Sequence, residues 1–259
     1  MQSKKSQSAA RRNSLTRLRL WIAIWVHVLN GVLVLCLFFP FISAKSKSTH
    51  TRKWSSKLLN IFGIQLEVFN QSILPNAPYL LASNHISWLD IHAINTFKPI
   101  RFVAKSEVES WPIFGWMAKQ LGTIFIKRGH SRNAAEVVKQ MTQILKTDSI
   151  CIFPEGTSTE GIRVKPFKAN LFESAVMSDS PVYSLAIQYF DISTGLRSDV
   201  AAFVGDMGLL ESMSKILNHR KLRIELRFLS PSEAMPKPSR DRKWLAMHSQ
   251  EQISLVLSS

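Results

Sequence analysis

The sequence is poor in cysteine, glycine and proline, with 2, 10 and 11 of these residues among 259. Two cysteines, Cys36 and Cys151, cannot build the disulfide framework of a small secreted protein or a zinc-binding Cys pair, so we expect a reducing compartment for the soluble part. Low glycine and proline contents, together with 46% hydrophobic residues, exclude collagen-like and low-complexity chains. We therefore expect one full-sized folded domain with an added segment.

Acidic residues are missing from the first quarter of the chain and begin only at Glu67. Eleven lysines and arginines precede it, whereas the remaining 193 residues contain 22 basic and 18 acidic side chains. The formal net charge of +15 therefore describes an N-terminal arm and not a basic domain. Because this arm has no aromatic motif of the RNA-binding kind, we expect no nucleic-acid partner.

A long uncharged run divides this arm. Residues 20–42 include 19 apolar side chains, and a helix of this length would reach about 34 Å, enough for a bilayer core of about 30 Å. A cleaved signal peptide is the alternative, but the run is long and no small-x-small cleavage pattern follows it. We therefore expect a membrane segment.

Basic residues flank the run on both sides, six before it and five after it, so the asymmetry that orients a single span is missing. Residues 51–62 combine apolar side chains at helical spacing with lysines, which predicts an amphipathic helix at an anionic membrane surface. Together they predict a membrane-embedded helical hairpin with both ends in the cytoplasm. A single span with a basic linker is the alternative. We accordingly divide the chain into an anchor, 1–63, and a second domain, 64–259.

Beyond residue 63, short β-like runs alternate with helical spacing, which is typical of an α/β fold. Strands are predicted at 64–69, 79–83, 100–104, 123–126, 149–153, 182–188, 200–204 and 221–228. Helices are predicted at 87–96, 111–120, 132–146, 167–177, 209–217 and 239–257.

A histidine stands where the second predicted strand ends, in Asn84-His85-Ile86-Ser87-Trp88-Leu89-Asp90. On one continuous helix, the spacing of His85 and Asp90 would separate their side chains by about 140°, whereas a non-helical turn at His85 would bring them together. A paired aspartate would fix the imidazole tautomer and leave the other ring nitrogen as a base. Taken alone, the pattern also fits a capped turn.

Two later strand ends also present polar groups. Pro154-Glu155-Gly156-Thr157-Ser158 forms a turn at the edge where α/β sheets bind ligands, although a capping surface turn has the same composition. The strand at 123–126 leads to Arg128 in Gly122-Thr123-Ile124-Phe125-Ile126-Lys127-Arg128.

These segments together resemble the lysophosphatidic acid acyltransferases of phospholipid synthesis. NHISWLD matches the family's H-x4-D block, GTIFIKR its second block and FPEGTS its third, and Pro181-Val182 falls where a fourth is expected. The resemblance spans about residues 55–228. It implies a mixed sheet flanked by helices, with transfer of a fatty acyl group from acyl-CoA or acyl carrier protein to the sn-2 hydroxyl of lysophosphatidic acid. The expected location is a bacterial inner membrane, with the catalytic domain on the cytoplasmic side.

By the same resemblance, His85 removes the proton of the acceptor hydroxyl and Asp90 stabilises the imidazolium, since no G-x-S-x-G serine is present. Arg128 and Lys105 bind the acceptor's phosphate, for which a guanidinium fork is well suited. The remaining substrate-binding residues implied by the blocks are Asn84, Gly122, Glu155, Gly156 and Thr157. We expect no metal and no cofactor other than the thioester co-substrate, because metal-ligand spacing such as HExxH is missing.

Two departures from the family pattern bear on the acceptor. Ser184 stands where the fourth block often has a second proline, and Ala169-Asn170 stands where relatives often have a basic residue and glycine. Enzymes that acylate lyso-ornithine lipids have similar blocks, so such a lipid is the alternative acceptor. A non-catalytic lipid-binding scaffold is the alternative of another class.

Overall fold

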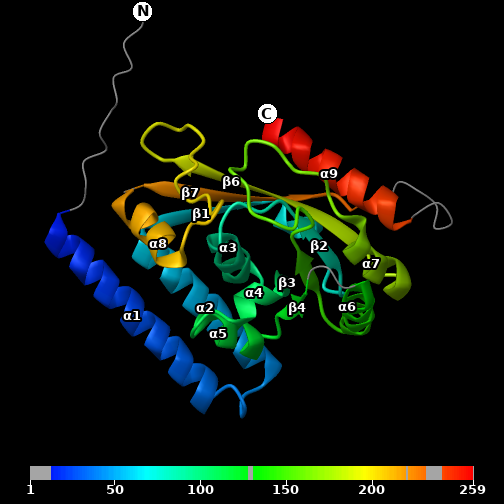
Figure 1. The fold of residues 1–259 in the computed structure, drawn as a ribbon, viewed down its shortest axis with the longest axis horizontal. Coiled ribbons are helices and arrows are strands. Elements are labelled where there is room, and N and C mark those ends of the chain that lie inside the picture. The colour runs from blue at the N-terminus through cyan, green and yellow to red at the C-terminus, as the bar shows by residue number, and fades with distance from the viewer. Residues whose placement is uncertain (1–12, 128–130, 220, 232–240, 259) are drawn as a thin grey trace, which may run out of the picture.

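The computed structural model describes residues 13–127, 131–219, 221–231 and 241–258, which form one mixed sheet between two layers of helices (Figure 1). The sheet has 7 strands in the order β1-β7-β6-β2-β5-β3-β4. The strands are β1 (Ile64–Phe69), β2 (Leu80–Ser83), β3 (Arg101–Lys105), β4 (Ile124–Ile126), β5 (Ile150–Ile152), β6 (Val182–Asp191) and β7 (Leu222–Leu229). The predicted mixed sheet is confirmed.

The strand directions decide where a site can form. β6, β2, β5, β3 and β4 run parallel, β1 runs parallel to β7, and β6 meets β7 antiparallel. The carboxyl ends of β2, β3, β4 and β5 therefore meet at one edge of the sheet, where α/β proteins bind ligands.

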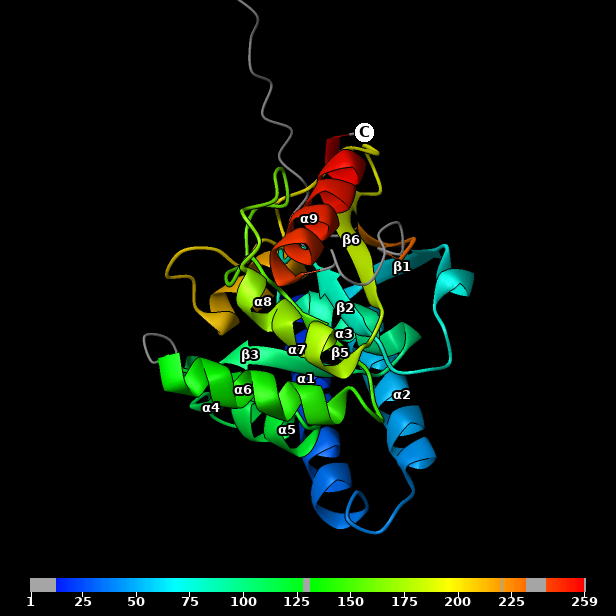
Figure 2. The same ribbon diagram turned by 90° about the vertical axis from the view of Figure 1, so that its right-hand side faces the viewer.

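The helices cover both faces of the sheet (Figures 1 and 2). They are α1 (Ser14–Leu37), α2 (Ala44–Phe62), α3 (Leu89–Phe97), α4 (Ser106–Glu109), α5 (Phe114–Gln120), α6 (Ser131–Ile144), α7 (Glu173–Ser178), α8 (Leu209–Asn218) and α9 (Arg242–Ser258), with 3₁₀ turns η1 (Gln71–Ile73) and η2 (Ala169–Phe172). Leu80 and Ala82 of β2 point into the core under α6, α7 and α9, whereas Leu81 points into the core under α1, α2 and α3. Because both faces of β2 are covered, Leu80, Leu81 and Ala82 are all apolar, and the strand ends in the buried Ser83.

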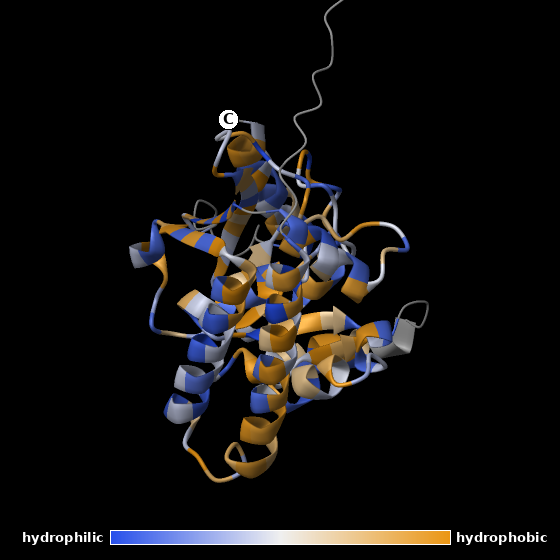
Figure 3. Ribbon diagram, turned by 90° about the vertical axis from the view of Figure 1, so that its left-hand side faces the viewer, coloured by the Kyte–Doolittle hydropathy of each residue, from blue (hydrophilic) through white to orange (hydrophobic). Residues whose placement is uncertain are grey.

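The two N-terminal helices differ from their predicted bounds. α1 begins at Ser14, where the side chain of Asn13 accepts a hydrogen bond from the Thr16 amide, and it ends before Pro40. α2 begins at Ala44, well before the predicted residue 51, because Ser43 caps it. Within the described residues, α1 is the one helix long and apolar enough to cross a membrane, and Figure 3 shows hydrophobic residues along its length. The membrane embedding of α1 and α2 stays a prediction.

A reciprocal contact joins α1 to α2. Nε2 of His27 donates to the Trp54 carbonyl at 2.9 Å, Nε1 of Trp54 donates to the His27 carbonyl at 3.1 Å, and the rings stack with centroids 4.5 Å apart. Gly31 permits this approach, because a Cβ there would lie 2.6 Å from Trp54 Nε1. The sequence pattern of an apolar run did not reveal this contact.

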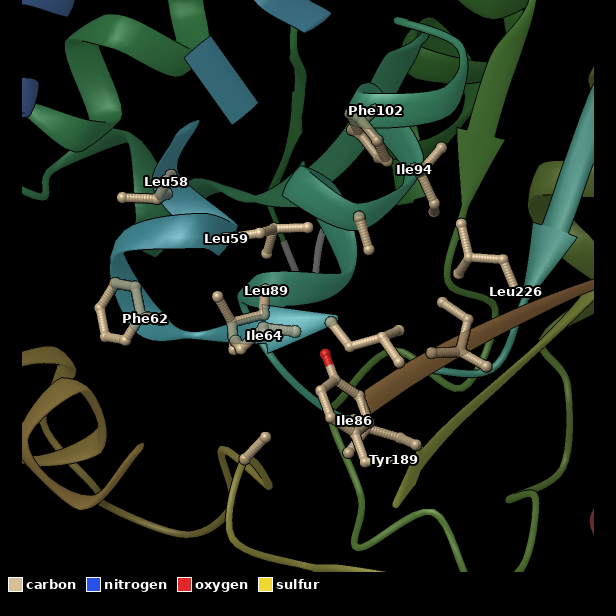
Figure 4. Close-up of a cluster of buried hydrophobic side chains, with 14 of the residues drawn as sticks. Leu58, Leu59, Phe62, Ile64, Ile86, Leu89, Ile94, Phe102, Tyr189 and Leu226 are labelled. Carbon is tan, nitrogen blue, oxygen red and sulfur yellow. The ribbon is translucent and has the colours of Figure 1, made fainter. Parts of the chain in front are cut away.

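The buried side of α2 belongs to the core beneath the sheet. Leu58, Leu59 and Phe62 cluster with Leu89 of α3 and Ile64 of β1 (Figure 4). The N-terminal helices and the sheet therefore share one core. The division of the chain at residues 63 and 64 stays a prediction.

Three predicted elements have different structures. The predicted strand at 200–204 is wrong: the segment is a loop, since the Ala202 amide donates to the Asp199 carbonyl and the Phe203 amide to the Ile86 carbonyl. The predicted helix at 111–120 is replaced at its start by a turn with φ of 64° at Ile113. The predicted helix at 167–177 divides into η2 and α7.

Candidate active site

His85 occupies a non-helical turn between β2 and α3, and this turn brings it to Asp90. Nδ1 of His85 lies 2.8 Å from Oδ2 of Asp90. The same oxygen accepts the backbone N–H groups of Ile86 and Ser87 at 2.8 and 3.0 Å. Asp90 therefore pairs with the imidazole and also caps the turn, so the two alternatives from the sequence are both realised. Because a carboxylate only accepts, Nδ1 donates and Nε2 is left as the basic nitrogen.

The second oxygen of Asp90 is held by a residue that the sequence analysis missed. The hydroxyl of Tyr189 donates to Oδ1 at 2.6 Å, and Asp90 has no exposed surface. Burial, followed by the nearby Asp90 charge, raises the pKa of Tyr189 well above its usual value, so its proton stays on the phenol. Tyr189 lies 99 residues from Asp90 in the sequence, in β6 beside β2. No local motif marks it.

Glu155 supports the turn from the other side. Its Oε1 accepts the His85 amide at 2.8 Å, and its Oε2 accepts the Lys165 amide at 2.9 Å. The residue is buried, and burial raises the pKa of its carboxyl, opposed by these two hydrogen bonds. Glu155 therefore holds the loop backbone through both of its carboxylate oxygens, and its part in substrate binding stays a prediction.

Asn84 also has a different role from the expected one. Its Nδ2 donates to the Ile187 carbonyl at 3.0 Å, and its Oδ1 accepts the Ile187 amide at 2.8 Å. The residue is 1% exposed. Its amide is thus committed to β6, and it fixes the His85 turn against the sheet without facing substrate.

A cleft of about 1570 Å³ opens beside His85. The imidazole stacks on Phe153 with centroids 4.0 Å apart, and 21% of the His85 side chain is exposed. Predicted site residues that also line the cleft are Lys105, Gly122, Gly156 and Thr157. Arg128 lies outside the described residues, while its neighbour Lys127 lines the cleft. The imidazole of His85 and two basic residues at the carboxyl ends of β3 and β4, Lys105 and Lys127, therefore line one cavity.

Known proteins resemble this chain in sequence and in fold. A family model described as Acyltransferase matches residues 65–188. The 1-acyl-sn-glycerol-3-phosphate acyltransferase of Neisseria gonorrhoeae is 31% identical over 261 residues, covering 100% of this chain and 97% of the relative. The chain belongs to the lysophosphatidic acid acyltransferase family. The resemblance inferred from the four blocks is thereby confirmed, and the protein is an acyltransferase.

Two further comparisons extend this result. The lyso-ornithine lipid O-acyltransferase of Pseudomonas aeruginosa is 31% identical over 207 residues, covering 80% of this chain and 78% of the relative. A crystal structure of the Thermotoga maritima 1-acyl-sn-glycerophosphate acyltransferase superposes with a TM-score of 0.66 at 17% identity, covering 94% of this chain and 95% of the other. This similarity establishes the shared fold. Tyr189 lies just beyond the segment that the family model matches.

Two glycines of this acyltransferase leave room for basic side chains. Gly156 has a φ of 70°, and a Cβ there would lie 2.7 Å from Nζ of Lys168, so the ammonium lies over the turn and lines the cleft. Gly122 has a φ of 79°, and a Cβ would lie 2.6 Å from Nη1 of Arg101. At both positions the absence of a Cβ lets a basic side chain pack against the backbone.

Neither a cysteine nucleophile nor a metal site is indicated by the described residues of this acyltransferase. Cys151 is fully buried in β5, and burial raises the pKa of its thiol well above the usual value, which disfavours a thiolate nucleophile. Over the described residues, no group of three or more His, Cys, Asp or Glu side chains is arranged to hold a metal ion.

Proposed function

We propose that this acyltransferase moves a fatty acyl group from a thioester donor to the sn-2 hydroxyl of lysophosphatidic acid, with His85 as general base. The observation that carries the proposal is the 2.8 Å pairing of His85 Nδ1 with the buried Asp90 at the edge of the cleft. This pairing directs Nε2 to the acceptor. The acceptor's own hydroxyl then takes the part that a serine has in hydrolases.

The reaction follows in two steps. Nε2 takes the hydroxyl proton as the acceptor oxygen attacks the thioester carbonyl, and Asp90 stabilises the imidazolium. The tetrahedral intermediate then collapses, the carbon–sulfur bond breaks, and the imidazolium returns the proton to the leaving thiolate. General-base help contributes about 10²–10⁴ in rate, whereas orienting two bound substrates can contribute about 7–11 kcal/mol. The groups that hold the substrates therefore matter as much as the base.

The acceptor's phosphate is proposed to bind at the basic strand ends. Lys105 is the last residue of β3 and lines the cleft, and Arg128 follows β4 in the sequence. Gly156 and Thr157 line the same cleft, and Lys168 beside Gly156 adds a third cation. This arrangement would hold a phosphate near the hydroxyl that His85 deprotonates.

The assignment calls for a membrane location, since both the acceptor and the product are lipids. Exposed apolar side chains follow one another at helical spacing along α1, among them Leu18, Ile22, Val26 and Leu29. Such a surface is suited to lipid contact. We place the protein at a bacterial inner membrane with the site on the cytoplasmic side.

Lyso-ornithine lipid is the second candidate acceptor, because a relative with that name is also 31% identical. That relative aligns with 80% of this chain, whereas the gonococcal relative aligns with all of it, including the N-terminal helices. The full-length match favours lysophosphatidic acid.

A direct test offers both acceptors, each with radiolabelled acyl-CoA or acyl carrier protein, to the purified full-length protein in mixed micelles. We expect labelled phosphatidic acid. Label found only in ornithine lipid would refute the acceptor. A His85→Ala variant with unchanged cellular function would instead support a scaffold, and His219→Gln, which alters a histidine paired with Asp191 away from the cleft, is the matched control.

A further inference from the structure

A second group of basic side chains lies on α2, away from the strand ends. Arg52, Lys53, Ser56, Lys57 and Asn60, together with Thr96 of α3, line a cavity of about 430 Å³. Residues four apart on a helix share a face, so Arg52, Ser56 and Asn60 form one row and the two lysines form the next. Every one of these side chains can donate a hydrogen bond, and none is a carboxylate.

The three cations of this group have no acidic partner in the structure. Over the described residues, neither Arg52, Lys53 nor Lys57 takes part in an ion pair. The sequence has no Asp or Glu before Glu67 that could neutralise them from the same helix. Like charges one helical turn apart repel each other, and a bound anion would remove that repulsion.

The α2 cavity adjoins the cleft that contains His85. Lys53 and Lys57 line both the α2 cavity and the large cleft. The opposite side of α2 is fixed, because Leu58, Leu59 and Phe62 are buried in the shared core. The basic side chains therefore project from a rigid support, as a binding site requires.

We propose that Arg52, Lys53 and Lys57 bind a phosphate group of the acyl donor. This inference rests on the proposed function, in which both substrates carry phosphate. The acceptor's phosphate is assigned to the ends of β3 and β4, so the phosphate of coenzyme A or of a carrier's prosthetic arm needs a second basic site beside the same cleft. The headgroup of an anionic phospholipid offers the same chemistry, and the test separates the two sources.

The first measurement is binding without catalysis. The probe is adenosine 3′,5′-bisphosphate, which carries phosphates of the donor but no acyl chain, and the full-length protein is used in neutral detergent. The Arg52→Gln and Lys57→Gln variants should each raise the dissociation constant about tenfold, the effect of losing about 1.4 kcal/mol. Lys45→Gln, an exposed lysine of α2 outside both cavities, should leave it unchanged. The result does not depend on which lysolipid is acylated.

The second measurement separates the two sources of phosphate. Binding to phosphatidylcholine vesicles is compared with and without phosphatidylglycerol, and the KM for acyl-CoA is measured in micelles. We expect the variants to raise that KM about tenfold, with kcat and the KM of the lysolipid preserved. If the variants lose their phosphatidylglycerol-dependent binding but keep their affinity for the bisphosphate, the site binds a lipid headgroup. That result would overturn the assignment to the acyl donor. Unchanged affinity for both probes would overturn the phosphate site itself.

Discussion

The hydroxyl of Tyr189 lies 2.6 Å from Oδ1 of Asp90, deep in the core behind His85. The two oxygens of Asp90 therefore have separate partners, since Oδ2 is occupied by His85 and two backbone amides. This arrangement fixes the plane of the carboxylate. An aspartate held in this way can orient an imidazole only as well as its own donors orient it.

Removing the Tyr189 hydroxyl should affect turnover more than binding. Tyr189→Phe leaves Oδ1 buried without its donor, which should lower the free energy of unfolding by about 1–3 kcal/mol. We expect kcat to fall about tenfold with the KM of both substrates preserved, because the variant alters only the orientation of the base. Steady-state kinetics and urea unfolding measure the two effects. Tyr79→Phe, in a buried tyrosine before β2, is the control; an equal loss of kcat there would contradict the assignment.

Asp90→Asn should separate charge from structure. The carboxamide can keep its oxygen toward His85 and the turn amides, while its NH₂ group donates to Tyr189, which can also accept. The fold should therefore survive, but the imidazolium loses its counter-charge, and kcat should fall about 10²–10⁴-fold. Turnover and thermal unfolding are the measurements. A folded variant that keeps more than about a tenth of the activity would show that Asp90 only caps the turn.

Local sequence was sufficient to predict the His85–Asp90 pair, because five residues and one strand end contain all the geometry involved. Lys105 and Arg128 were instead inferred from the family resemblance; Lys105 lines the cleft, and Arg128 lies outside the described residues. Tyr189 could not be predicted, since its contact depends on the register between β6 and β2, which hydrophobic periodicity does not specify.

Burial explains why motifs alone did not reveal which partners some polar side chains have. Asn84 and Glu155 have side chains that suit substrate binding, yet both are buried with their polar atoms bonded to backbone. Residues 200–204 have the apolar composition of a strand, but the amide of Phe203 bonds to Ile86 and the segment closes over the site turn. Composition cannot show which group accepts the hydrogen bond of a given backbone N–H.

Acid should destabilise the protein through His92. This residue of α3 lies between the rings of Trp54 and Trp88, at 5.5 and 5.8 Å, and its buried Nδ1 has no hydrogen-bond partner over the described residues. Burial, and then the nearby His27, lowers the pKa of His92 from 6.5 to about 4. The unfolded chain therefore binds a proton that the folded chain refuses between these values, so stability is lost as the pH falls from about 6.5 to about 4.

The contribution of His92 can be isolated with His92→Gln. Between pH 7 and pH 5, this group should cost the wild-type protein about 2 kcal/mol of unfolding free energy, at about 1.4 kcal/mol per pH unit below 6.5. The variant should show a correspondingly flatter pH dependence in urea unfolding. An identical slope in both proteins would mean that folding does not lower the pKa of His92.

Gly31 should be intolerant of any side chain because of Trp54. A Cβ at residue 31 would lie 2.6 Å from Nε1 of Trp54, where the indole donates to the His27 carbonyl. Gly31→Ala should therefore separate α1 from α2 and lower the free energy of unfolding by about 1–3 kcal/mol, even though alanine favours helix. Gly208→Ala, at a glycine with no atom within 4 Å of the added Cβ, should be free of this steric cost.

A double-mutant cycle with Trp54→Phe identifies the cause of this loss. Phenylalanine removes the indole nitrogen that the new methyl group would meet, so Gly31→Ala should cost much less in that background, with a coupling energy of about 1 kcal/mol or more. Gly31→Ala should also lower the rate of acyl transfer more in the wild-type background than in the Trp54→Phe background. His27, Gly31 and Trp54 all line the cleft that contains His85. An equal cost of Gly31→Ala in both backgrounds would show that the added methyl group meets another neighbour, such as Cε of Met117 at 3.0 Å, and not the indole nitrogen.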